Sequence, residues 1–182
     1  MDMENVLQLY TEKMQLAAVQ RANQYALQYG MNLSEEDCRL LLQARRMTLK
    51  EQERLELREG ILPKLIYAFC DSAYVIQETF RETIEQLQEI FYIFKNESMD
   101  LLTDDELICF MRDQYDGICF GDMDYLEGTC LEIFAAAVRA GYSGYKGQDR
   151  AGVGARQFAA FDEAPRWNRE LYLEKIRELT EG

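Results

Sequence analysis

The first stretch of the chain repeats apolar side chains at steps of three and four residues, the spacing of one face of an α-helix. This repeat runs through Leu7, Tyr10, Met14, Ala18, Ala22, Tyr25 and Tyr29. It predicts a long amphipathic helix over residues 3–29, with Gly30 as its C-terminal cap. A stronger repeat runs through Ile76, Phe80, Ile84, Leu87, Phe91 and Phe94. It predicts a central helix over residues 73–96.

Start and stop signals predict further helices between these two. Ser34 precedes three acidic residues, which is typical of a helix N-terminus and predicts a helix over residues 35–46. Thr48 and Glu51 have the spacing of a capping box and predict a separate short helix that ends at Gly60. Pro63 is tolerated in the first turn of a helix and predicts another short helix there.

The second half of the chain continues the helical pattern. Thr103 and Glu106 form another capping box, and the apolar spacing after Leu126 predicts a helix over residues 124–139. Residues 141–164 are rich in glycine and small polar side chains, which predicts a long loop. Residues 165–182 begin with a proline and carry an apolar face, which predicts a last helix that docks on the same domain.

Strand-like alternation of convincing length is missing from the sequence, and no internal repeat has a fixed period. The predicted fold class is therefore all-α, a single globular domain of about six to eight helices with no significant sheet. Residues 1–140 form its predicted core domain.

Composition supports a folded, cytoplasmic protein. The chain has 182 residues, of which 48% are hydrophobic and 29% are charged. It contains no apolar run near the roughly 20 residues of a membrane span, and its acidic start is unlike a secretory signal. The five cysteines are widely spaced and never in a Cys-x-x-Cys pair, so we expect reduced core residues.

Charge is distributed unevenly along the chain. Residues 71–140 carry 16 acidic and 4 basic residues, a net charge of 4 − 16 = −12, while residues 1–70 hold 10 acidic and 9 basic residues. Such a region attracts a basic partner or a cation and repels nucleic acid. The chain also has no histidine, the commonest general base and the commonest metal ligand.

Part of the spacing of a calcium-binding loop occurs in this acidic region. Asp116, Asp124 and Glu127 occupy positions one, nine and twelve of such a loop. Positions three and five are Ile118 and Phe120, which offer no side-chain oxygen to calcium. The sequence therefore favours a turn between packed helices and keeps a divalent-cation site on the three acids as an alternative.

Other motifs are explained more simply by helix and loop structure than by ligand binding or catalysis. The glycines of residues 141–154 lack the order of a phosphate-binding loop, and the basic residues of 39–58 alternate with acids, unlike a DNA-reading surface. The carboxylates of residues 104–106, and Glu78, Glu82, Glu85 and Glu89, are explained by helix capping and helix surfaces. A carboxylate-based enzyme without histidine remains an alternative, while the sequence favours a non-enzymatic role that needs no cofactor.

Three segments carry a resemblance to a known family: Ser72-Ala73-Tyr74, Glu89 through Glu97, and Thr103 through Leu107. In these segments, and over roughly residues 30–140, the chain resembles a family of small bacterial proteins classed only as a domain of unknown function. The resemblance implies no activity, ligand or functional residue.

The resulting hypothesis is a cytoplasmic protein-interaction module that offers the acidic surface of residues 97–132 to a basic protein partner. Charge reversal at Asp104, Asp105 and Asp113 is expected to weaken capture of that partner and to leave thermal stability nearly unchanged. Self-association remains an alternative. The apolar faces of the first and last predicted helices could be buried by the core of the same chain or by a second copy of it.

Overall fold

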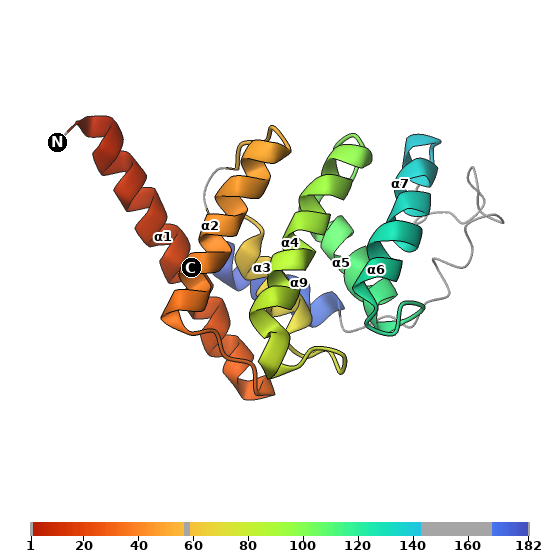
Figure 1. The fold of residues 1–182 in the computed structure, drawn as a ribbon, viewed down its shortest axis with the longest axis horizontal. Coiled ribbons are helices and arrows are strands. Elements are labelled where there is room, and N and C mark those ends of the chain that lie inside the picture. Colours follow the sequence, from red (N-terminus) through yellow and green to blue (C-terminus); the bar gives the residue numbers. More distant parts are fainter. Residues whose placement is uncertain (1, 57–58, 143–168, 182) are drawn as a thin grey trace. The chain divides into compact units, whose positions relative to one another are not determined.

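The computed structural model describes residues 2–56, 59–142 and 169–181 (Figure 1). Every regular element in these ranges is helical, which confirms the all-α prediction. The chain divides into two compact units, Met1–Glu89 and Ile90–Gly182. The predicted loop of residues 141–164 lies almost entirely outside the described residues, as do residues 165–168 of the predicted last helix.

The first unit begins with the long helix that the sequence predicts. Helix α1 (Met3–Ala26) continues into the 3-10 turn η1 (Leu27–Tyr29). Gly30 then ends the helix with a left-handed φ of 81°. Small side chains fill the buried face of the C-terminal half of α1, where it packs against α3 and α2: Ala18, Val19, Ala22 and Ala26.

Helix α2 (Glu35–Glu51) starts at the predicted cap, because Ser34 and Asp37 form a reciprocal capping box. The predicted break before Thr48 is wrong, and no separate helix begins there. Thr48 is buried within α2, whose buried face continues through Leu49. A capping-box pattern therefore occurs inside a helix that packing holds together.

Helix α3 (Leu62–Phe69) has Pro63 in its first turn, as predicted. The central helix starts later than predicted, since the 3-10 turn η2 (Gln77–Thr79) precedes α4 (Phe80–Glu97). The Ser72 hydroxyl accepts a hydrogen bond from the Tyr74 amide at 3.3 Å, and Ile76 is extended and half exposed. A hydrogen bond from the backbone to a side chain of this kind competes with helix formation. The apolar repeat therefore begins several residues before the first residue of α4.

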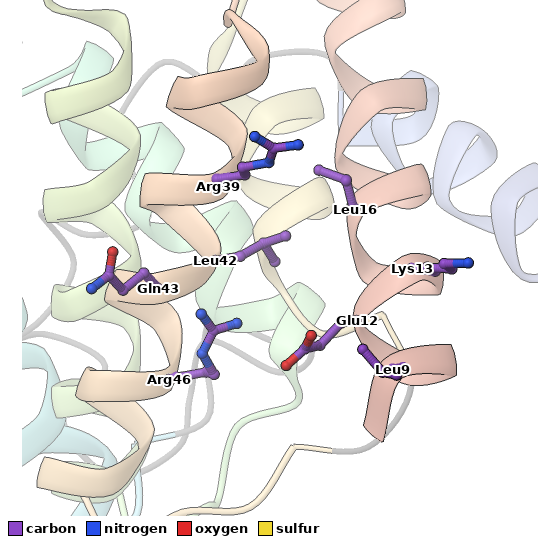
Figure 2. A pocket seen from close by; sticks show the side chains of 8 residues that line it. All are labelled: Leu9, Glu12, Lys13, Leu16, Arg39, Leu42, Gln43 and Arg46. Carbon is purple, nitrogen blue, oxygen red and sulfur yellow. The ribbon is translucent and has the colours of Figure 1, made fainter. Parts of the chain in front are cut away.

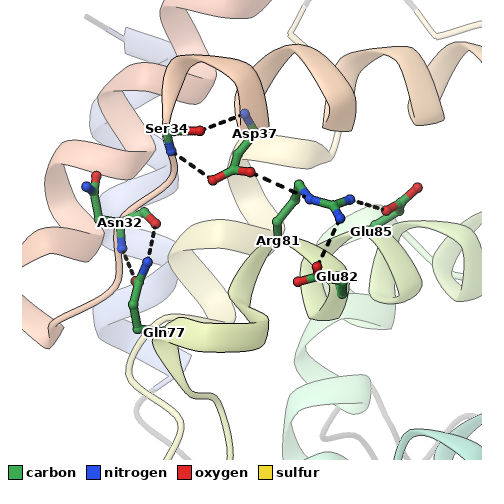
Figure 3. Close-up of polar contacts among 7 residues, drawn as sticks. All are labelled: Asn32, Ser34, Asp37, Gln77, Arg81, Glu82 and Glu85. Atoms are coloured by element: carbon green, nitrogen blue, oxygen red, sulfur yellow. Dashed lines mark hydrogen bonds and ion pairs between the residues drawn. The ribbon is translucent and has the colours of Figure 1, made fainter.

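Polar side chains fix the entrance to α4 beside the start of α2 in the first unit (Figure 3). Gln77 exchanges two hydrogen bonds with the backbone of Asn32, at 2.6 and 2.8 Å. Arg81 lies 3.6 Å from Asp37 and also pairs with two glutamates of its own helix, Glu82 and Glu85. Asp37 thus caps the N-terminus of α2 and also forms an ion pair with α4.

The second unit contains the part of α4 from Ile90 onward and the remaining helices. They are α5 (Asp104–Asp116), the short α6 (Met123–Tyr125), the π-helical turn η3 (Leu126–Leu131), α7 (Glu132–Arg139) and α9 (Arg169–Glu181). The predicted helix over residues 124–139 is therefore present, with a π turn inside it. The rings of Phe110 and Phe134 stack with centroids 3.5 Å apart, and Tyr172 and Ile176 bury one face of α9.

Candidate functional site

An acidic pocket of the second unit is the candidate site. Its cavity volume is about 290 Å³, and the C-terminal part of α4, the π turn and α7 supply its walls. The lining side chains are Ile93, Phe94, Glu97, Glu127, Glu132, Ala135 and Arg139. Three carboxylates and one guanidinium give this lining a net charge of 1 − 3 = −2.

The π turn explains how Glu127 and Glu132 come to the same pocket. Residues five apart in an α-helix point about 140° away from each other, because one turn takes 3.6 residues. A π-helix bonds residue i to residue i+5, which turns two such residues toward one face. Residues 126–131 are π-helical, so Glu127 and Glu132 both line the cavity.

Only one of the three carboxylates is neutralised by the pocket's own cation. Arg139 donates to the Glu97 carbonyl at 2.5 Å and lies 3.4 Å from the Glu97 carboxylate. Glu127 and Glu132 are exposed, and neither side chain pairs with a residue that the structure describes. Two negative charges of the pocket are therefore available to a ligand.

The rest of the lining is apolar. Phe94 and Ala135 are buried, and Ile93 is partly exposed beside them. Lysine and arginine place an apolar stem along such surfaces while the charged end remains near water or an anion. A pocket with this wall and unpaired carboxylates at its rim fits a basic side chain.

The three aspartates predicted for partner binding lie elsewhere in the second unit, and each has a partner within it. Asp104 lies 2.9 Å from the Lys95 ammonium, and Asp105 accepts a hydrogen bond from Tyr172 at 3.2 Å. Asp113 pairs with Arg169 and is only 3% exposed. The expectation that Asp113 belongs to an acidic surface is therefore corrected.

Burial governs the ionisation of the groups beside these aspartates. It raises the pKa of the Tyr172 hydroxyl well above the usual value, and the charge of Asp105 adds to this effect. Burial likewise raises the pKa of the Cys109 thiol to about 12, although Arg169 opposes the shift. Both groups therefore stay protonated at neutral pH, and Tyr172 remains a hydrogen-bond donor.

The residues of the predicted calcium loop do not form a cluster. Asp116 accepts a hydrogen bond from Arg112 at 2.6 Å, Asp124 lies on the short α6, and Glu127 lies in the acidic pocket. Phe120 is 72% exposed with a left-handed φ of 48°. Across the ranges that the structure describes, no three acidic or cysteine side chains are grouped to hold a metal ion.

The five cysteines are buried, as expected for core residues, and none of them is in a disulfide. Cys119 and Cys130 approach each other most closely, with sulfur atoms 3.5 Å apart. Their hydrogen bond and burial raise the pKa of the Cys119 thiol above its usual value. This environment keeps the Cys119 thiol protonated, whereas the same hydrogen bond lowers the pKa of the Cys130 thiol.

Among the charged residues of the pocket, sequence reasoning singles out only Glu127 and misses Glu97, Glu132 and Arg139. A regular helix would separate Glu132 from Glu127, so spacing alone gives no reason to pair them. Gly128, an isolated glycine inside an apolar helical pattern, was the available signal of irregular structure.

Comparison with protein families matches residues 18–144 to the Family of unknown function (DUF6323). The chain belongs to this family. The resemblance to a family of unknown function is thereby confirmed, and the match contains α2 through α7 together with the whole acidic pocket. Neither the curated proteins nor the solved structures contain a match to this DUF6323 chain. Among its described helices, none has the length and apolar character needed to cross a membrane.

Proposed function

We propose that this DUF6323 protein is a non-enzymatic interaction module that binds a basic segment of a partner protein in its acidic pocket. The observation that carries the proposal is the pair of exposed, unpaired carboxylates, Glu127 and Glu132, at the rim of one cavity. A lysine or arginine side chain of the partner enters with its stem against Phe94 and its charge between the two carboxylates.

The surrounding charge supports this choice of partner. Residues 71–140 have a net charge of −12, which attracts cationic segments and increases their association rate. Arg139 pairs with Glu97 and not with Glu127 or Glu132. An incoming cation therefore does not have to displace an existing ion pair from these two carboxylates. The proposal includes a cytoplasmic location, where the five free cysteines would stay reduced.

The test is a fluorescence-anisotropy titration of the full chain with a labelled hexalysine peptide at low salt. Glu127→Gln with Glu132→Gln removes the two pocket charges, and we expect binding to weaken by about tenfold or more. Glu51→Gln with Glu89→Gln is the matched control, because it removes two exposed charges outside the pocket. Absence of binding to the unmodified protein, or an equal loss in both double variants, would contradict the proposal.

A further inference from the structure

The N-terminal half of α1 exposes an unusual amount of apolar surface. Its large apolar side chains are between 40% and 76% exposed: Met3, Val6, Leu7, Leu9, Tyr10 and Met14. In the first unit, these turns of α1 diverge from α2, whereas the following turns approach it (Figure 1). Apolar patches of this kind on a folded protein mark sites of association.

One edge of this surface opens into a groove between α1 and α2. The groove has a cavity volume of about 360 Å³. Its apolar side chains are Leu9 and Leu16 from α1 and Leu42 from α2. Figure 2 shows Leu42 and Arg39 reaching from α2 toward α1. Because Leu9 belongs to both features, the groove and the exposed turns of α1 form one continuous apolar surface.

The polar lining of the groove is mainly cationic in a protein whose net charge is −13. Lys13, Arg39 and Arg46 line it, opposed by one acid, Glu12. Arg39 pairs with Glu35 of its own helix at 2.8 Å in an exposed contact that contributes little stability. Lys13 and Arg46 are exposed, and neither pairs with a side chain that the structure describes.

We infer that this groove is a second docking surface, which binds an amphipathic, acidic α-helix of a partner protein. Apolar side chains on one face of that helix cover Leu9, Leu16 and Leu42, and its flanking carboxylates meet Lys13 and Arg46. A basic or neutral helix would leave both cations without partners. The surface lies wholly within the first unit and selects the opposite charge from the acidic pocket, so the inference is independent of the proposed function.

The test uses two labelled helical peptides of about 14 residues, long enough for four apolar anchors at i, i+3, i+7 and i+10. Both carry leucine anchors, with glutamate flanks in one peptide and lysine flanks in the other. We expect saturable binding of the glutamate peptide to the full chain, weakened about tenfold or more by Lys13→Glu with Arg46→Glu. Lys50→Glu with Arg177→Glu makes the same change in net charge at exposed positions outside the groove, and should weaken binding far less.

A variant that removes an apolar side chain tests the other half of the recognition. Leu9→Gln changes a side chain that is already 49% exposed, so melting followed by circular dichroism should be unchanged while the glutamate peptide binds more weakly. Three results would overturn the inference: no binding of the glutamate peptide, an equal loss in the two charge-reversed double variants, or dimers in sedimentation that Lys13→Glu with Arg46→Glu abolishes. The last result would assign the groove to a second copy of this chain.

Discussion

At the scale of single residues, burial separates acids that look equivalent in the sequence. Asp104 and Asp113 both lie on α5, but the Asp104 side chain is 45% exposed and that of Asp113 only 3%. An exposed ion pair contributes little to stability, whereas loss of one member of a buried pair leaves an uncompensated charge. The two aspartates should therefore differ in what they contribute to the fold.

We predict that Asp113→Asn lowers the free energy of unfolding by about 2 kcal/mol, because Arg169 loses its buried carboxylate. Asp104→Asn should cost less, about 1 kcal/mol, because the buried Lys95 ammonium keeps the Leu102 carbonyl as an acceptor and water reaches the half-exposed side chain at position 104. Urea denaturation of the two variants measures the difference. Equal losses would show that burial does not distinguish these ion pairs.

At the scale of helices, backbone conformation decides what a glycine does. A Cβ added at Gly30 or at Gly128 would meet no other atom within 4 Å. Gly30 has a left-handed φ of 81° where α1 ends, whereas Gly128 lies inside the π turn without a positive φ. The available space therefore predicts that alanine has the same effect on stability at both sites. The backbone conformation predicts effects of opposite sign.

We predict that Gly30→Ala destabilises the protein by about 1 kcal/mol, because a side chain disfavours the left-handed conformation. Gly128→Ala should stabilise it by about 0.5–1 kcal/mol, because alanine has less backbone freedom to lose on folding. Midpoints of urea denaturation check both variants. Shifts of the same sign would contradict the argument from conformation.

At the scale of the whole molecule, charge is the dominant feature. The net charge is −13, and residues 71–140 alone carry −12, so the folded chain holds many like charges close together. Such self-repulsion disfavours the compact state and is screened by salt. Exposed ion pairs act in the opposite direction, but each contributes little.

We predict that the melting temperature rises when sodium chloride is increased from about 20 to about 300 mM, because the screening length becomes shorter than the spacing of most surface charges. Differential scanning calorimetry measures this shift. Tetramethylammonium chloride is the matched control. If screening is the cause, this salt should raise the melting temperature as sodium chloride does. A lower melting temperature in both salts would mean that favourable ion pairs outweigh the repulsion between like charges.

Local sequence signals determined much of the helical architecture. Gly30, Ser34, Pro63 and Thr103 each mark a helix end where the structure has one. Their effects depend on neighbours a few residues away, through a cap, a fixed φ or a left-handed turn, so no tertiary contact is needed to predict them. The acidic character of residues 71–140 is likewise a property of the sequence alone.

Tertiary structure decided what the local signals could not. Packing of the buried face carried α2 through Thr48, where a capping pattern predicted a break, and burial removed Asp113 from the surface. The π turn gathered Glu127 and Glu132 at one pocket, and α1 and α2 brought Lys13 and Arg46 to one groove. The sequence therefore determined most of the helix ends and which charges the helices carry. Only the fold decided which charges meet, because contacts between distant residues depend on packing and not on local spacing.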